Sequence, residues 1–503
     1  MLFNSLRFLI FFTIVILVYF LLPPPKYKKN LRQYWLLIAS YYFYANWNAK
    51  YILLILFSTL TTYLSGLAIA KIQSYYSEYK KQQAMKKLIV VFSFTLNLSI
   101  LFYFKYFNFT LNILHSLFSK INIEFPVPDL NITLPVGISF FTFQALSYTM
   151  DVYRNEIYAE KNFFKYALFV SFFPQLVAGP IERSKNLLKQ LSLSAHFSFE
   201  RARDGVLLMI WGYFLKIVIA DRIAIFVDTI FNDITTYGGY YLVIAIILFS
   251  FQIYCDFYGY SVIAMGAAEI LGVNLMENFH SPYLSTNVAD FWRKWHISLT
   301  SWFRDYLYFP LGGSRKGVLR KYINKIIVFL ISGLWHGASF SFIVWGGING
   351  LYQVLGEMTA PLRNQSMHLL RLNKDSIGHK VLKAFITFIL IDFSWLFFRA
   401  GSWTTSLDVL ESIKSVHNPW ILFDGSLYTC GLDSKNFWIM IVSILILLAV
   451  DICNHYGIKL RNIIVAQDYW CRWLMISVSV IAILIFGIWG TAYDASGFIY
   501  FQF

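Results

Sequence analysis

The sequence predicts an all-α, polytopic integral membrane protein. Three observations support this: 58% of the 503 residues are hydrophobic, only 14% are charged, and apolar stretches near 20 residues long recur along the chain. A soluble domain carries about 25% charged residues, and a helix needs about 20 apolar residues to cross a bilayer. The composition therefore excludes a secreted enzyme, a soluble Rossmann protein and a nucleic-acid-binding domain as descriptions of the whole chain.

Apolar segments divide the chain into roughly 11–13 predicted transmembrane or re-entrant helices. The N-terminal segment ends in a run of prolines without a small-residue cleavage site, so we interpret it as an uncleaved first span rather than a signal peptide. The segments lie near residues 6–22, 33–49, 51–70, 88–107, 132–150, 165–180, 205–220, 240–264, 326–356, 384–398, 437–453 and 473–490.

Two of these segments do not fit a simple series of spans. The run 165–180 is short, ends in Gly179 and Pro180 and has basic loops on both sides, so we expect a re-entrant or interfacial segment. Residues 326–356 contain no Asp, Glu, Lys or Arg. This stretch is long for one span and short for two, and basic loops flank it as well. We therefore predict a tight helical hairpin that bends near 337–339.

The basic residues predict the orientation of the spans. Of the 42 Lys and Arg residues, 32 lie in the segments 23–32, 71–87, 151–204, 272–321, 357–383 and 454–472. Because basic residues collect in cytoplasmic loops, we expect these segments inside and both termini outside. The same bias accounts for the net charge of +15 without a nucleic-acid partner.

His336 is the first candidate functional residue, because it lies within the uncharged stretch 326–356. An ionisable group at membrane depth is costly and is a functional candidate by default. The neighbouring Gly333 and Gly337 permit close backbone approach and could leave room for a substrate beside the imidazole. A packed, purely structural histidine is the alternative.

His296 is the second candidate. Read at helical spacing, residues 290–306 form an amphipathic helix suited to a membrane interface, with the basic residues mostly on the opposite face. The inward face carries Trp292, Trp295, His296, Leu299, Phe303 and Tyr306. Packing or interface anchoring is the alternative reading, because a stripe of tryptophans more often packs than binds.

The two histidines favour proton transfer over metal chemistry. Neither has an obvious third ligand nearby, and the sequence contains no His-Glu-x-x-His or zinc-type Cys/His spacing, so we expect no metal. A Gly-x-Ser-x-Gly elbow and a Walker A loop are also absent from the sequence. Histidine, with an unperturbed pKa of about 6.5, can act as a general base near neutral pH. Deprotonating an alcohol that attacks an acyl thioester is one such use.

The motifs resemble the membrane-bound O-acyltransferase superfamily, and within it the branch of alginate O-acetyltransferase membrane subunits and peptidoglycan O-acetyltransferases. The most specific blocks surround the two histidines. The matching blocks are MLFNS (1–5), ASYYFY (39–44), PVGISFFTFQ (135–144), YTMDVYR (148–154), FPQLVAGPI (173–181), DFYGYS (256–261), FWRKWHISL (291–299), WFRDYLY (302–308), PLGG (310–313), GLWHG (333–337) and YFQF (500–503).

This resemblance implies a single domain of this type over residues 1–503, with helices around a central tunnel and cytoplasmic amphipathic helices. The family's catalytic histidine falls on His336 and its second functional histidine on His296. The residues expected to bind substrate are Trp335, Trp295, Gly337, Trp292, Arg304 and Asp305, with Trp335 and Trp295 walling the tunnel.

The resemblance also implies a donor and partners. The donor substrate would be acetyl-CoA or a carrier-bound acyl thioester, with no resident cofactor. The basic face of 272–321 suits an acidic acyl carrier or the phosphates of coenzyme A, although positive-inside bias and lipid headgroup contact explain its charge equally well. The expected partner is an extracytoplasmic acetyltransferase or another polysaccharide-modifying protein.

The expected activity is therefore acyl transfer, most simply acetyl transfer, across the bacterial cytoplasmic membrane to an extracytoplasmic polysaccharide. An alginate-like exopolysaccharide is the first choice of acceptor and peptidoglycan the second. The alternatives are D-alanyl transfer to teichoic acid and a transporter or flippase of the polysaccharide pathway without catalysis. A structural scaffold would leave a histidine at an uncharged hairpin bend unexplained.

Overall fold

The computed structural model describes residues 1–23, 30–125, 128, 132–177, 179–193, 195–489 and 499. Within these residues the chain forms helices, turns and loops without a β-strand, which confirms the all-α class. Its contacts group it into two compact units, Met1–Met209 with Ala264–Met276 and Ile210–Ile263 with Glu277–Phe503. Three lysines of the first basic segment (26, 28 and 29) and the C-terminal motif 500–503 lie outside the described residues.

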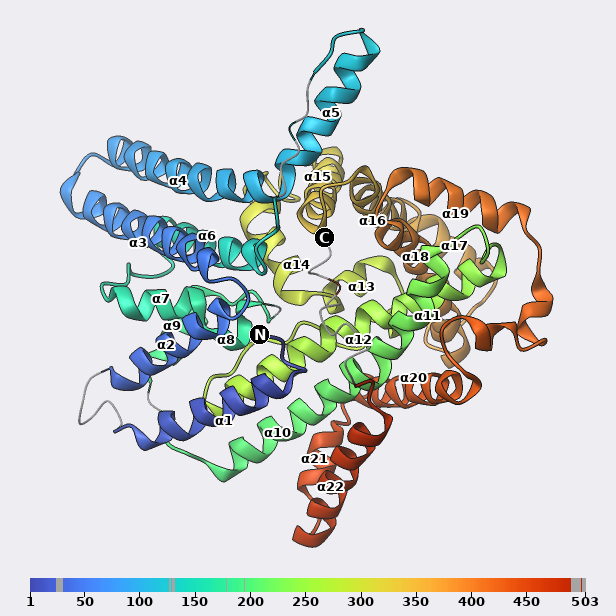
Figure 1. The fold of residues 1–503 in the computed structure, drawn as a ribbon. Helices are drawn as coiled ribbons and strands as arrows, with labels where there is room; N and C mark the ends of the chain where they lie inside the picture. The colour runs from blue at the N-terminus through green and yellow to red at the C-terminus, as the bar shows by residue number, and fades with distance from the viewer. Residues whose placement is uncertain are drawn as a thin grey trace. The chain divides into compact units, whose positions relative to one another are not determined.

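The first unit is organised around a packed group of three helices, α3 (Ile52–Tyr75), α4 (Tyr79–Leu101) and α6 (Ile138–Tyr153) (Figure 1). Nearly every side chain of α6 is buried. A π-helical turn, Phe102–Tyr106, continues α4 into α5. The other helices are α1 (Leu6–Leu21), α2 (Leu31–Ala45), α5 (Phe107–Lys120), α7 (Phe163–Ser171), α8 (Phe173–Leu176), α9 (Ser184–Leu191) and most of α10 (Phe199–Tyr213).

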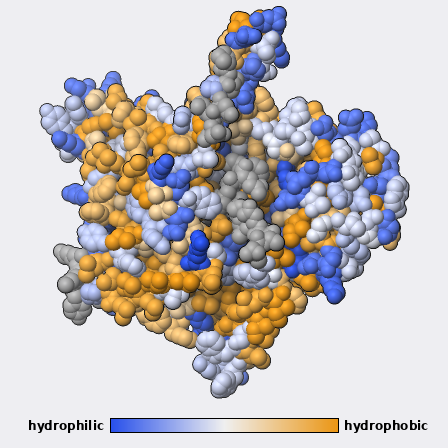
Figure 2. Space-filling view, viewed as in Figure 1, coloured by the Kyte–Doolittle hydropathy of each residue, from blue (hydrophilic) through white to orange (hydrophobic). Residues whose placement is uncertain are grey.

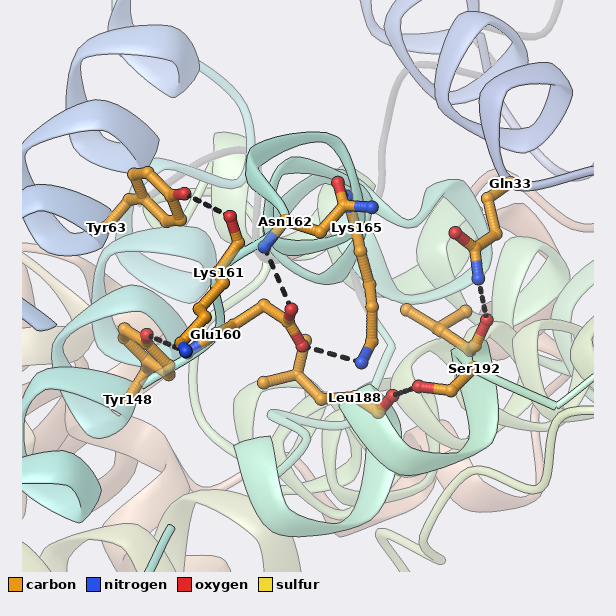
Figure 3. Close-up of polar contacts among 10 residues, drawn as sticks. Gln33, Tyr63, Tyr148, Glu160, Lys161, Asn162, Lys165, Leu188 and Ser192 are labelled. Atoms are coloured by element: carbon orange, nitrogen blue, oxygen red, sulfur yellow. Dashed lines mark hydrogen bonds and ion pairs between the residues drawn. The ribbon is translucent and has the colours of Figure 1, made fainter. Parts of the chain in front are cut away.

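The run 165–180 was predicted to be a re-entrant or interfacial segment rather than a full span, and it does not form one long helix. It falls on α7 and α8, of nine and four residues, and Pro174 lies at the start of α8. Figure 3 shows how the connection from α6 into α7 is held. The Glu160 carboxylate pairs with Lys165 at 2.6 Å, and the Glu160 backbone N–H donates to the Tyr148 hydroxyl. The Asn162 side chain also caps α7 by accepting the N–H of Lys165. The entry to this broken segment is therefore built from polar contacts.

The second unit contains the α15–α16 hairpin, which packs against α18. A π-helical turn, Phe214–Ala220, joins α10 to α11. The helices are α11 (Asp221–Asn232), most of α12 (Tyr240–Ile270), α13 (Val288–Lys294), α14 (Ile297–Phe303), α15 (Val318–His336), α16 (Phe340–Met358), α17 (Ala360–Leu369), α18 (Ile377–Ala400), α19 (Trp403–Ser415), α20 (Ser434–His455), α21 (Leu460–Val465) and α22 (Tyr469–Phe486).

Each apolar segment predicted from the sequence overlaps one or more helices, and these helices differ in length. Within the described residues, six stretches are long and apolar enough to cross a membrane: Ala49–Tyr75, Tyr79–Lys120, Tyr240–Ile270, Ile377–Ala400, Ser434–His455 and Tyr469–Phe486. The N-terminal helix α1 is apolar but shorter. Hydrophobic side chains form broad areas on the face seen in Figure 2. Such surfaces are expected where helices face lipid rather than water.

Candidate active site

His336 is the last residue of α15 and lies at the bend of the hairpin. Gly337 leaves the helix with an extended backbone, and α16 begins three residues later at Phe340. The predicted hairpin and its bend are therefore confirmed. Only 5% of the His336 surface is exposed. Its ring lies 4.9 Å from that of Trp335, 5.0 Å from that of Trp345 and 5.5 Å from that of Phe398, measured between centroids.

Glycines let the two arms of the hairpin approach closely. A Cβ atom added at Gly333 would overlap the carbonyl oxygen of Phe342, and one added at Gly346 would overlap that of Phe329. A Cβ at Gly337 would overlap the ring of Phe342. The space beside Gly337 is thus filled by an aromatic side chain from α16, so this glycine serves the packing of the bend.

The chain around His296 differs from the single amphipathic helix predicted for residues 290–306. Helix α13 ends at Lys294, Trp295 is extended, and His296 adopts a left-handed conformation with φ 44° before α14 begins. A non-glycine residue in this conformation costs about 1–2 kcal/mol. The prediction of one helix is therefore wrong, although the burial of its aromatic face is largely confirmed, since Trp292, Trp295, His296, Leu299 and Phe303 are all buried.

Backbone groups from residues 278–280 account for the break. The N–H of His280 donates to the carbonyl of Lys294 at 3.0 Å, and the N–H of Ile297 donates to the carbonyl of Asn278 at 2.9 Å. These bonds satisfy groups on both sides of the break, which a continuous helix would have paired internally. A segment outside the helical pattern thus decides the conformation at His296, so periodicity within 290–306 could not reveal it.

The break brings the two histidines together. The His296 and His336 ring centroids are 6.4 Å apart, and Trp335 lies 6.1 Å from His296. The ring of Phe257, from α12, packs at a near right angle to the His296 ring, with their centroids 4.6 Å apart. Burial lowers the pKa of His296 to about 3, because the positive imidazolium loses its hydration. His296 is therefore neutral at physiological pH.

The tryptophans predicted to bind substrate lie in the same aromatic cluster. Trp295 stacks on Phe291 at 5.3 Å and contacts Trp395 at 5.1 Å. Trp292 packs on Trp345 at 5.6 Å and donates from its indole nitrogen to the Asn349 side chain at 3.2 Å. These two tryptophans therefore pack against other rings around the histidines.

Sequence reasoning missed two aromatic neighbours of His336, Trp345 and Phe398. Trp345 could have been found, because it lies nine residues after His336 on the returning arm of the predicted hairpin. Phe398 belongs to α18, and no spacing in the sequence connects it with the bend. Only the packing of α18 against α16 brings it there.

Arg304 and Asp305 are placed differently from the tryptophans. They lie in a π-helical turn, Arg304–Tyr308, that follows α14. Their side chains pair with each other at 2.9 Å, and 59% of the Arg304 side chain is exposed. The structure thus places Arg304 at the surface, where it is accessible to a charged group.

The arrangement supports proton transfer in an apolar environment. Two buried imidazoles face a shared aromatic enclosure, and at least one of them is neutral. A neutral imidazole offers both a proton acceptor and an N–H donor. Hydrogen bonds and charges act more strongly in such a low-dielectric environment than in water.

Comparison with known proteins identifies the family of the chain. Residues 40–398 match the membrane-bound O-acyltransferase family, a range that includes both histidines. The chain is 36% identical over 368 residues to a probable alginate O-acetylase of Pseudomonas putida, which covers 72% of this chain and 70% of the relative. It is 35% identical over 406 residues to a peptidoglycan O-acetyltransferase of Helicobacter pylori, covering 76% and 73%.

A more distant group of relatives carries a different acyl group in its name. A teichoic acid D-alanyltransferase of Bacillus subtilis is 27% identical over 237 residues, which covers 44% of this chain and 58% of the relative. The family match spans most of the chain and agrees with the resemblance carried by the motifs. This chain therefore belongs to the membrane-bound O-acyltransferase family and is a multi-pass membrane acyltransferase.

Proposed function

We propose that this protein transfers an acetyl group from a cytoplasmic thioester across the membrane for O-acetylation of an extracytoplasmic polysaccharide. The proposal rests on the relatives at about 35% identity, which are named for O-acetylation of alginate and of peptidoglycan. The D-alanyltransferases match less of the chain at lower identity. An alginate-like exopolysaccharide is thus the first candidate acceptor and peptidoglycan the second.

In this proposal His336 is the general base. The observation that supports it is the position of His336 at the hairpin bend, buried among aromatic rings and 6.4 Å from a second histidine. The acceptor hydroxyl gives its proton to the imidazole as its oxygen attacks the thioester carbonyl. The new C–O bond forms, the C–S bond breaks, and the proton passes to the departing sulfur.

His296 has a complementary role in the proposed reaction. With its pKa lowered to about 3 by burial, it stays neutral and can donate an N–H hydrogen bond to the carbonyl oxygen, where negative charge develops. Trp335 and Trp295 would line the path of the acyl group. Arg304 and Asp305, at the surface, would contact the charged part of the donor.

The family resemblance supplies the proposed donor and partner, and the basic residues of 272–321 suit such a donor. We expect these residues on the cytoplasmic face, where they would receive acetyl-CoA or an acidic carrier bearing an acyl thioester. Both termini would lie on the extracytoplasmic side of the bacterial cytoplasmic membrane. An extracytoplasmic acetyltransferase or related protein would complete the delivery to the polysaccharide.

Labelled acetyl transfer by the purified protein in vesicles tests this function. Acetyl-CoA carrying a labelled acetyl group is supplied on one side, and an alginate oligosaccharide or peptidoglycan fragments together with the extracytoplasmic partner protein on the other. We expect covalent label on an acceptor with the parent protein and none with His336→Ala. Equal label with both proteins would contradict the role of His336. Label arriving only from a D-alanyl thioester would identify the alternative substrate, and movement of unmodified solute without acylation would identify a transporter.

A further inference from the structure

We propose that Asn278 is a positioning residue that holds His296 in its working orientation. The inference rests on the function proposed for His296 and adds a residue that acts through it. Asn278 lies in the loop between α12 and α13, is fully buried and was not singled out by any motif. It is nevertheless hydrogen bonded to both residues that follow His296.

Asn278 caps the helix that begins beside the histidine. Its side-chain oxygen accepts the N–H of Ser298 at 3.3 Å, and its backbone carbonyl accepts the N–H of Ile297 at 2.9 Å. These are the first two N–H groups of α14, which have no partner within the helix. Where Ser, Thr, Asp or Asn stands in the position of His296, its own side chain commonly supplies this cap.

Because Asn278 caps α14, the imidazole of His296 does not have to supply that cap. His296 occupies the N-cap position of α14, yet its side chain makes no capping hydrogen bond. Because Asn278 satisfies those N–H groups, the His296 ring can turn towards Trp335 and His336 instead of towards its own helix. The same bonds support the left-handed backbone that the histidine must adopt.

Asn278 is itself fixed by a membrane-spanning helix. Its side-chain nitrogen donates to the hydroxyl of Ser261 on α12 at 3.0 Å, so every polar atom of the carboxamide group has a role. Farther along the same loop, the Ser281 hydroxyl donates to the Asp451 carbonyl on α20 at 2.9 Å. The loop that positions His296 is thus hydrogen bonded to two long helices, α12 and α20.

The test compares Asn278→Ala with a matched capping residue. Asn287 caps α13 in the ordinary way, since its side-chain oxygen accepts the N–H of Asp290 at 2.8 Å. Asn287→Ala removes the same kind of bond one helix earlier. We expect Asn278→Ala to lower kcat by about 10²-fold with little change in the KM for the thioester, because a displacement of about 1 Å can cost that much. Asn287→Ala should keep the parental kcat.

A double substitution separates positioning from folding. His296→Asn suits the left-handed backbone, because Asn tolerates it better than most residues do. If Asn278 acts through His296, adding Asn278→Ala to His296→Asn should lower turnover no further. A full additional loss in that background would overturn the proposal, and so would a parental kcat for Asn278→Ala.

The outcomes also distinguish this inference from the function on which it rests. Parental turnover of His296→Asn would refute the role of His296 itself. Impaired His296→Asn with independent, multiplicative loss from Asn278→Ala would refute only the positioning role. The residual turnover of His296→Asn could be too low to measure. In that case the changes in kcat and KM of Asn278→Ala are compared with those of Asn287→Ala. Equal losses in the two variants, or a loss confined to KM, would refute positioning.

Discussion

The two histidine rings lie 6.4 Å apart but are held in place by opposite means. His336 ends a regular helix, and two of its ring neighbours, Trp335 and Trp345, belong to the same hairpin, while Phe398 comes from α18. His296 interrupts a helix, takes a left-handed conformation and depends on a loop that precedes α13. The conformation of His336 follows from its own hairpin, whereas that of His296 requires residues 278–281 and their anchors on α12 and α20.

This contrast shows what each position tolerates. At the hairpin the demand is steric, because glycines permit backbone approach at Gly333 and Gly346. At His296 the demand is for hydrogen bonds that compensate a strained backbone. Substitutions at the hairpin should therefore act through volume, and substitutions around His296 through lost backbone partners.

The largest expected effect is the loss of the proposed base. His336→Ala should lower acyl transfer by about 10³-fold or more, since a positioned acid–base group contributes about 10²–10⁴-fold. The measurement is single-turnover transfer of labelled acetyl by protein purified in detergent. Equal abundance and an unchanged melting temperature would show that folding is retained. Turnover within a few-fold of the parent would contradict the assignment.

The loss of His296 should be severe but smaller. His296→Asn should reduce turnover by about 10²-fold, because it removes the imidazole while keeping a residue suited to positive φ. His296→Ala should show the same chemical loss together with a lower melting temperature, since alanine adopts this backbone less readily. Near-parental turnover in both variants would restrict His296 to packing.

Adjacent glycines on α16 test the steric demand of the hairpin. Gly346→Ala would place a methyl group on the Phe329 carbonyl oxygen, and we expect a loss of about 1–3 kcal/mol in stability together with lower activity. Gly347→Ala is the matched control, because its Cβ would meet only the Leu330 side chain at 3.5 Å. Helix propensity should make that control neutral or stabilising. Equal effects of the two changes would argue against close approach.

Burial of His296 predicts a pH-dependent stability. Its pKa is about 3 in the folded protein and about 6.5 when unfolded. Below pH 6.5 the unfolded chain binds a proton that the folded protein does not, so stability falls as the pH is lowered towards 3. Between pH 7 and pH 5 this residue should cost about 2 kcal/mol. Melting in detergent should show a smaller decrease over this range for His296→Asn than for the parent.

The smallest expected effect concerns the surface pair. Arg304→Ala breaks an exposed ion pair with Asp305, and exposed pairs contribute about 0–1 kcal/mol. Stability should therefore change little. If Arg304 contacts the donor, the KM for the thioester should rise several-fold while kcat is kept, and raised salt should reduce the difference. An unchanged KM would remove Arg304 from the donor site.

The sequence by itself determined the helical membrane class, the positions of the apolar helices and the hairpin with His336 at its bend. These features depend on composition and local pattern, because a lipid environment excludes charge and requires continuous helices. The glycines near the bend could also be identified from the sequence, because they lie within the same uncharged stretch. The motifs also placed the chain in its family, which the comparisons confirmed.

Only the tertiary structure decided the break at His296, the approach of Phe398 to His336 and the capping by Asn278. In each case the partner comes from a separate element of the chain. Helical periodicity predicts which side chains share a face, but it does not show which hydrogen bonds other segments make with the backbone. The residues 278–280 offer such bonds, and they convert a predicted continuous helix into two short helices with a histidine between them.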